Sequence, residues 1–353
     1  MLRSYKLYIF LLLSFCFNVS GQGDNKYNLL TERYVDRPLA MHKGQFQIAS
    51  GYQFSIINQK YDQDGNKIDL TIDGSVSAQH KLPFTVKYGL FEFLQFSIST
   101  SYASMGIRSQ SRDVISDDSE LFINELNKYI GFYDLYAGTD LTIPIKLHLI
   151  NWVITAGVSL PVFNYEPDKP GHSFTPFDTQ TGLALLNYKY NHKNATGIPD
   201  ALFGSAVKIR TKKFSFTGLV EYSAALKDGE SYDWNFRWIT NEFEYEKETY
   251  QFNTGKLLNI AGEAAWQAID WFVLKGSITH FHQGNGWSNI TGRKVGNPEI
   301  SLTNFTVGYE ILISPLLRIE QQIILPVNGK NILGQWAFLS GFSMNMMTFQ
   351  PKP

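Results

Sequence analysis

Apolar and polar residues alternate through much of this chain, and this period of two restricts its fold more than any other feature. The odd positions between Gln45 and Ile56 carry amides, hydroxyls and small residues, and the even positions carry Phe46, Ile48, Ser50, Tyr52, Phe54 and Ile56. Because successive side chains of a β-strand point to opposite faces, this segment predicts a strand with one apolar and one polar face. A soluble sheet turns its apolar face to a protein core, whereas a membrane barrel turns it to lipid around a wet lumen.

Twelve segments share this pattern, and each is near the length of about 9–11 residues that a tilted strand needs to cross a bilayer. They are 45–57, 81–90, 93–104, 132–144, 151–162, 200–210, 213–224, 256–267, 271–281, 300–312, 316–325 and 335–348. Segment 232–250 is rich in Trp, Phe, Glu and Tyr and would add two strands, so fourteen is the alternative number.

The connections between these segments alternate between two lengths. Short turns follow every second segment, near 90–92, 146–150, 211–212, 268–270 and 313–315, whereas long polar loops occupy 58–80, 105–131, 163–199, 225–255 and 282–299. Short turns at one rim and long loops at the other are typical of outer-membrane barrels. The sequence therefore predicts an all-β, antiparallel transmembrane barrel in the outer membrane of a Gram-negative bacterium, with short periplasmic turns and long extracellular loops.

The N-terminus has the composition of a secretory signal. Two basic residues precede an apolar run, Leu7 to Phe17, that is too short to span a bilayer, and Val19-Ser20-Gly21 fits a cleavage site. We therefore expect residues 1–21 to be a signal peptide and Gln22 to begin the mature chain. The sole cysteine, Cys16, lies inside this segment, so the mature chain has no disulfide.

The predicted barrel, residues 45–349, has a segment of different character on each side. Residues 22–44 are polar and lack a clear period, and they form an extension that either hangs in the periplasm or partly plugs the lumen. Residues 350–353 form a short tail. The end of the last strand, 342–349, is expected to be essential for insertion by the barrel assembly machinery.

Charged residues on the polar faces of the strands are the candidate lumen lining. Their two signs are nearly balanced, which favours a salt-bridged interior over strong ion selectivity. An electrostatic lining that guides a solute is the alternative. The candidates are Lys87, Asp134, Asp140, Lys208, Arg210, Glu221, Glu263, Lys275, Glu310, Arg318 and Glu320.

Four aromatic residues in one long loop are candidates for stacking on a sugar or an apolar solute. They equally fit an aromatic girdle that continues above the membrane, which is the favoured interpretation. These residues are Tyr232, Trp234, Phe236 and Trp238.

Charge and motifs argue against nucleic acid and against catalysis. The net charge of −1 lacks the basic excess that nucleic acid requires. His172-Ser173 lacks the spacing of a hydrolase site, and His280 and His282 fit polar interfacial positions better than a metal site. We expect no cofactor, no metal and no enzyme activity, and an outer-membrane hydrolase is the less favoured alternative.

Three further motifs have simpler interpretations. Asp62-Gln63-Asp64-Gly65-Asn66 resembles part of a calcium loop, but the closing glutamate is absent, so the segment predicts a plain turn. Asn194-Ala195-Thr196 and Asn289-Ile290-Thr291 match glycosylation acceptors, and we interpret both as chance matches.

Three stretches of the chain have recurring family motifs: Arg37-Pro38-Leu39-Ala40-Met41-His42-Lys43-Gly44-Gln45-Phe46-Gln47, Tyr88-Gly89-Leu90-Phe91-Glu92-Phe93-Leu94-Gln95 and Gly131-Phe132-Tyr133-Asp134-Leu135-Tyr136-Ala137-Gly138. With these stretches the sequence resembles a family of outer-membrane barrels, the one named for the meta-pathway of phenol degradation. The likeness covers roughly residues 35–145 and continues only as a pattern. The chain departs from the family in a longer acidic second loop and in its short tail.

The resemblance implies a porin-like or transport-like barrel, although the family name does not establish phenol as the solute. We therefore expect passage or capture of small, apolar or aromatic solutes, with outer-membrane lipid and a small molecule as partners. A structural or adhesive surface protein with a closed lumen is the alternative.

Overall fold

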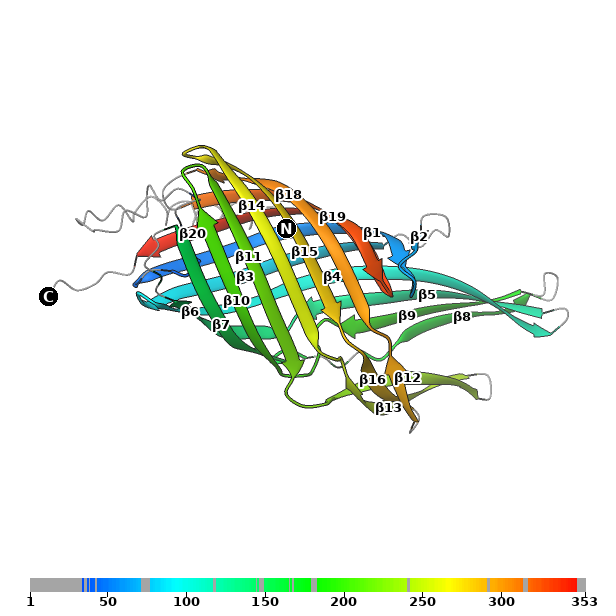
Figure 1. The fold of residues 1–353 in the computed structure, drawn as a ribbon. Helices are drawn as coiled ribbons and strands as arrows, with labels where there is room; N and C mark the ends of the chain where they lie inside the picture. Colours follow the sequence, from blue (N-terminus) through cyan, green and yellow to red (C-terminus); the bar gives the residue numbers. More distant parts are fainter. Residues whose placement is uncertain are drawn as a thin grey trace, which may run out of the picture.

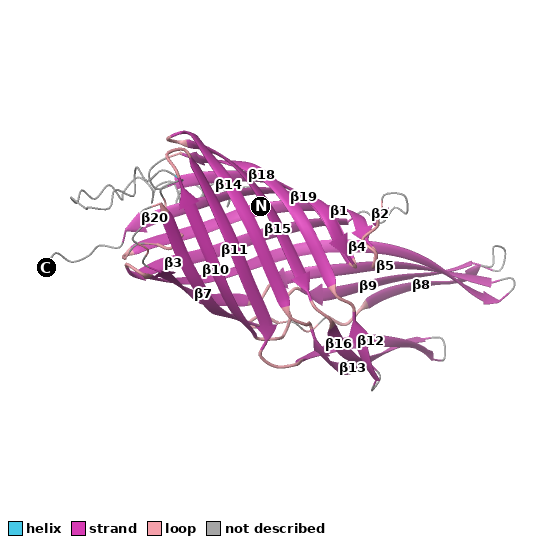
Figure 2. Cartoon of the chain, viewed as in Figure 1, coloured by secondary structure: helices cyan, strands magenta, loops and turns pink. Residues whose placement is uncertain are grey.

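The computed structural model describes residues 34, 37, 39–41, 43–70, 77–116, 119–143, 145, 149–164, 166, 168–178, 183–239, 242–290, 293–313 and 317–347. The predicted signal peptide, most of the predicted extension and the C-terminal tail lie outside these residues. Among the described residues, no helix is both long and apolar enough to cross a membrane. Strands make up nearly all of the regular structure that is drawn (Figure 2).

Twelve antiparallel strands form a closed barrel (Figure 1). They are β1 (Gln45–Tyr61), β3 (Ser77–Phe91), β4 (Leu94–Ser116), β6 (Leu135–Ile143), β7 (Ile150–Leu160), β10 (Asp200–Arg210), β11 (Phe214–Ala225), β14 (Leu257–Ile269), β15 (Phe272–Gln283), β18 (Ile300–Leu312), β19 (Leu317–Lys330) and β20 (Ile332–Met347). Because β1 pairs with both β3 and β20, the first and last strands close the ring. The twelve predicted segments each fall on one of these strands, which confirms the predicted fold class.

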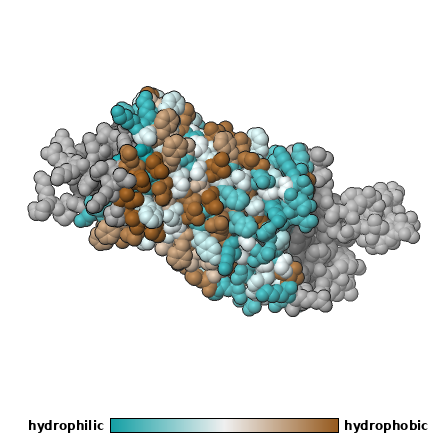
Figure 3. Space-filling model, viewed as in Figure 1, coloured by the Kyte–Doolittle hydropathy of each residue, from teal (hydrophilic) through white to brown (hydrophobic). Residues whose placement is uncertain are grey.

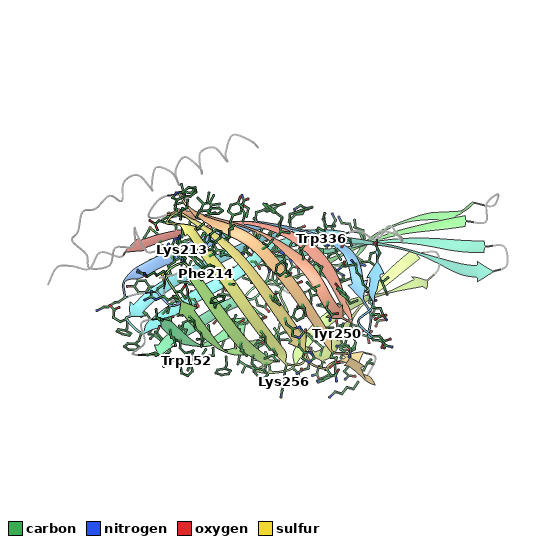
Figure 4. All side chains as sticks on the ribbon, turned by 45° about the horizontal axis from the view of Figure 1, so that its top comes forward. Trp152, Lys213, Phe214, Tyr250, Lys256 and Trp336 are labelled. Carbon is green, nitrogen blue, oxygen red and sulfur yellow. The ribbon has the colours of Figure 1, made fainter. Side chains whose placement is uncertain are left out.

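The outer face of the barrel is apolar. On β18, Phe305 and Val307 are 40% and 46% exposed. Thr306, which lies between them, and Glu310, which follows them on the same strand, are buried. The same alternation exposes Trp152 on β7, Phe214 on β11 and Trp336 on β20, which Figure 4 labels. Figure 3 shows hydrophobic residues gathered over part of the barrel surface, with hydrophilic residues toward the end where the long connections lie. An apolar exterior around a polar interior is the inverse of a soluble sandwich.

The two rims of the barrel differ as the loop lengths predict. At one end, here called the turn rim, β10 connects to β11 and β14 to β15 through a few residues each. The backbone N–H of Thr211 donates to Phe214 O at 2.7 Å, which closes one of these turns. The opposite end, here called the loop rim, carries the long connections.

The long connections contain further strands that the sequence pattern did not predict. Strand β4 continues beyond the barrel and pairs with β5 (Ser119–Phe132), and the hairpin of β8 (Gly171–Asp178) and β9 (Leu183–Lys193) extends the same sheet. Figure 1 shows these strands projecting from the loop rim. Periodicity reveals a strand only when one face is apolar, and residues 105–131 and 163–199 lack that alternation.

The fourteen-strand alternative is wrong. Segment 232–250 does form strands, β12 (Gly229–Ile239) and β13 (Glu242–Asn253), but they pair with β16 (Gly286–Ile290) and β17 (Arg293–Asn297) in a separate four-stranded sheet. These strands are not part of the barrel wall, because β11 pairs directly with β14. A short strand, β2 (Lys67–Asp69), pairs antiparallel with the end of β1.

The chain kinks at the loop rim, where β5 passes into β6. Strand β4 pairs with β6 up to Ser99 and with β5 from Tyr102 onward. Gly131 adopts a φ of 125°, a conformation that L side chains rarely adopt, and Tyr133 N donates to Ser101 O at 2.8 Å. The side-chain amide of Asn194 fastens this kink by donating to Ala103 O at 2.8 Å and to Gly131 O at 3.0 Å.

Candidate functional site

The described residues just before β1 lie against the inner face of the barrel. Gly44 N donates to Gly89 O at 2.8 Å next to the β3–β4 turn, so the chain reaches the lumen from the turn rim. Met41 N then donates to Gln95 Oε1 on β4 at 2.7 Å, and Leu39 N donates to Asn151 Oδ1 on β7 at 2.9 Å. We call residues 34, 37 and 39–41 the lumen segment.

Lys208 on β10 holds the backbone of the lumen segment. Its ammonium donates to Tyr34 O at 2.8 Å and to Arg37 O at 3.0 Å, and the residue is 6% exposed. Charge-assisted hydrogen bonds of this kind are stronger than neutral ones. The predicted lumen residue Lys208 therefore binds protein carbonyl groups in this structure.

Three carboxylates on β14, β18 and β19 anchor the side chains around the segment. Arg37 Nη1 donates to Glu310 Oε1 at 2.5 Å, and the Tyr34 hydroxyl donates to Glu263. Lys275 contacts Glu320 and lies 3.7 Å from Glu310. These contacts bring predicted residues from separate strands into one ion cluster.

The ring of Tyr34 is surrounded by cations. Lys208 Nζ, Arg37 Cζ and Lys275 Nζ lie 4.8, 5.1 and 5.3 Å from its centroid. Each is within the range in which a ring quadrupole attracts a cation. Burial and the carboxylates of Glu263 and Glu310 raise the pKa of Tyr34 well above its ordinary value. The phenol therefore stays protonated, and its hydroxyl donates a hydrogen bond to Glu263.

A cavity of about 440 Å³ remains between the lumen segment and the wall. Its charged lining consists of Arg37, Lys87, Lys208 and Arg318 with the carboxylate Glu263. Its apolar lining includes Leu39, Ala40, Met41, Leu219 and Ala261. A smaller cavity of about 150 Å³ lies beside Glu310, Arg318 and Glu320. The lumen is therefore narrowed but not filled in this part of the barrel.

Two predicted residues lie in a polar patch of the inner wall that Gln95 links to the lumen segment. Asp140 accepts hydrogen bonds from Gln95 Nε2 and from Thr155 Oγ1, the latter at 2.6 Å. Glu221 accepts one from Asn259 Nδ2 at 2.9 Å. Amide and hydroxyl donors thus solvate both carboxylates, as charges in a confined interior require.

Asp134 and Arg210 lie at opposite ends of the barrel. Asp134 follows the kink at the loop rim and accepts hydrogen bonds from the backbone and hydroxyl of Thr196, while burial raises the pKa of its carboxyl group. Arg210 ends β10, where its backbone N–H donates to Leu149 O at 2.9 Å. Asp134 and the backbone of Arg210 are thus held at the loop rim and the turn rim, respectively.

The four loop aromatics are placed only through their backbone. Strand β12 carries them, and the register with β13 pairs Tyr232 with Thr249, Trp234 with Lys247, Phe236 with Tyr245, and Trp238 with Phe243. Their side chains lie outside the described part of the structure. The choice between a binding surface and a girdle therefore stays a prediction.

The remaining motifs have structural roles in the described chain. Asp62 accepts backbone hydrogen bonds from Asp64 and Asn66 within a tight turn, and the bonds from Asn66 lower the pKa of its carboxyl group. His280 Nδ1 lies 2.9 Å from Thr303 Oγ1, and among the residues that the structure describes no group of three His, Cys, Asp or Glu side chains could hold a metal.

Sequence reasoning missed several residues that build the site. Tyr34 and Arg37 lie in a segment without periodicity, so no pattern indicated where they would bind. Gln95 and Asn151 do follow the inward alternation of β4 and β7, and their position was available from the pattern. They are absent from the predicted lining because it contains only charged residues.

Comparison with known proteins gives a likeness of structure only. No family model matches the chain, and no curated protein sequence matches it. The crystal structure of an outer-membrane channel from Pseudomonas putida F1 matches with a TM-score of 0.60 at 11% identity, covering 87% of this chain and 97% of that chain.

Two channels for monoaromatic hydrocarbons are more distant. CymD matches with a TM-score of 0.43 at 9% identity, covering 88% of this chain and 90% of its own. The TodX deltaS2S3 mutant matches with a TM-score of 0.46 at 9% identity, covering 93% of this chain and 95% of its own. At such low identity a likeness shows only the fold, and the match to the Pseudomonas channel, with its TM-score above 0.5, supports that likeness. This chain has the fold of the outer-membrane β-barrels.

Proposed function

We propose that this chain is a channel of the Gram-negative outer membrane that passes small solutes through a lumen narrowed by its own N-terminal segment. The observation that carries the proposal is a closed barrel with an apolar exterior and an interior lined with charges and cavities. Apolar side chains facing outward bind lipid favourably, and a polar lumen admits water and solute. The proposal involves no chemical step and no cofactor.

The orientation follows from the rims. Short turns face the periplasm and long connections face the outside in barrels of this type, so we place the turn rim on the periplasmic side. The lumen segment then enters from the periplasm and acts as a partial plug. Insertion would use the barrel assembly machinery, with β20 as the strand that closes the ring.

The solute class is the finer part of the proposal. The resemblance to the barrels of the phenol-degradation family suggests apolar or aromatic solutes, and we propose that this chain is a distant member of that family. The apolar part of the larger cavity, with Leu39, Met41 and Leu219, is compatible with such solutes. A cavity of this size is in the range of ordinary small-molecule sites.

A structural or adhesive surface protein is the second candidate. The strands that project from the loop rim favour it, because they enlarge the surface available to a partner. The many contacts that hold the lumen segment also favour a closed lumen.

Reconstitution separates the two candidates. Purified full-length mature protein is inserted into planar bilayers for conductance and into liposomes for swelling with neutral sugars and with benzyl alcohol. We expect discrete conductance and solute entry above empty liposomes. Protein that inserts but gives neither signal would contradict the channel and leave the structural role.

A further inference from the structure

We propose that the larger lumen cavity is a binding site for a small organic anion, with a carboxylate or similar group held by basic side chains and an apolar body beside the lumen segment. This inference deepens the channel function proposed above and rests on it. It concerns which solutes the cavity retains, whereas the channel proposal concerns whether solutes pass.

The first argument is the charge of the cavity. Arg37, Lys87, Lys208 and Arg318 line it together with one carboxylate, Glu263. Nearby, Glu310 pairs with Arg37 and with Lys275, and Glu320 pairs with Lys275. The described part of the cavity lining itself therefore holds four basic side chains and one carboxylate. Charges in a confined interior are stabilised by a counterion, and a solute anion would supply one.

The second argument is the position of Lys87. It lies on β3 with Gln47 opposite on β1 and Ser97 opposite on β4, so its cross-strand neighbours are neutral. None of the described residues forms an ion pair or hydrogen bond with its ammonium, although the residue lines the cavity. The other three cations of the lining already have interactions. Lys87 is therefore the basic group most available to a ligand.

The third argument is the polarity of the remaining lining. Leu39, Ala40, Met41, Leu219 and Ala261 give the cavity an apolar side. An inorganic anion would leave that side in contact with water only, whereas an aromatic or aliphatic carboxylate would cover it. The volume of about 440 Å³ is ample for a single-ring acid.

Binding of benzoate and benzyl alcohol to the full-length mature protein in detergent tests this inference. The two probes have similar size, but only benzoate is charged at pH 7. Isothermal titration calorimetry should show benzoate binding about tenfold more tightly than benzyl alcohol, as expected for one charge-assisted contact. Added sodium chloride should weaken the binding of benzoate and leave the binding of benzyl alcohol unchanged.

Lys87→Met tests the residue assignment, since it removes the charge and keeps an unbranched side chain only one heavy atom shorter. It should reduce benzoate affinity to that of benzyl alcohol, whereas Lys256→Met, which removes an exposed lysine outside the lumen (Figure 4), should leave benzoate binding as in the unmodified protein. Equal affinity for the two probes, or unchanged benzoate binding in Lys87→Met, overturns the inference. If Lys87→Met fails to fold, the unmodified protein still tests the inference. The difference in affinity between the two probes, and the salt dependence of benzoate binding, then decide whether the cavity binds an organic anion.

Liposome flux on the same preparations keeps the two proposals apart. Flux of neutral sugar without a preference for benzoate contradicts the anion site and supports the channel. Preferential benzoate binding without any flux supports the anion site and contradicts the channel.

Discussion

Lys208 shows how a charged side chain of the inner wall can hold the lumen segment in place. A lysine on the inner wall of a barrel suggests ion selectivity, but here its ammonium is directed at two backbone carbonyl groups of the lumen segment. Its charge thus fixes a peptide in place instead of facing a passing ion. The effect of neutralising it should appear first in the width of the pore.

Lys208→Met should free the lumen segment and raise the single-channel conductance. The substitution removes two charge-assisted hydrogen bonds, each worth about 1.5–3 kcal/mol in proteins. Planar-bilayer recordings at several salt concentrations measure the effect, with Lys256→Met as the control on an exposed lysine. Conductance equal to that of the unmodified channel would mean that the segment does not obstruct the pore.

The strands of this barrel could be predicted because the requirement for an apolar outer face leaves a period of two in the sequence. Each strand of the ring carries exposed apolar residues on alternate positions, and that period was sufficient to find all twelve. Strands β5, β8 and β9 project beyond the ring, where no lipid requires an apolar face, so the period is lost although backbone pairing continues. The kink between β5 and β6 could not be predicted from the sequence either, because it is held by Asn194, which is distant in sequence.

Asn194→Ala should loosen the loop rim without opening the ring. The alanine leaves Ala103 O and Gly131 O without the amide donor, at a cost of about 1–2 kcal/mol of unfolding free energy. Limited proteolysis of the folded protein in detergent should show faster cleavage near the kink, with thermal unfolding shifted to lower temperature. Asn285→Ala, at an exposed position near the same rim, serves as the control. Equal cleavage rates in the two variants would argue against the fastening role of Asn194.

At the scale of the whole molecule, the division between outer and inner faces carries the membrane assignment. Val220 near the middle of β11 is 47% exposed on the outer face, whereas Thr217 on the same strand lines the larger cavity. The candidate lining residues were predicted from this division, and several do meet in one cluster. The sequence did not predict how the lumen segment lies against the wall. A segment without periodicity does not indicate which of its side chains face the wall.

Val220→Arg should impair folding into lipid far more than Thr217→Arg. A lipid-facing arginine costs about 2–4 kcal/mol near the bilayer midplane, whereas a lumen-facing one stays hydrated. Urea titrations of both variants in lipid vesicles, followed by tryptophan fluorescence, give the two free energies. A soluble protein would show no such contrast, so equal losses would contradict the placement of the outer face in lipid.

The joining of β1 to β20 has a consequence for biogenesis. Gln45 lies opposite Met347, so residues from the two ends of the described chain meet along a single seam. The lumen segment lies inside the ring, near Gly44, whose N–H donates to Gly89 O at the turn rim. The wall holds this segment through the side chains of Gln95, Asn151 and Lys208, so its release would break none of the backbone hydrogen bonds that join β1 to β20.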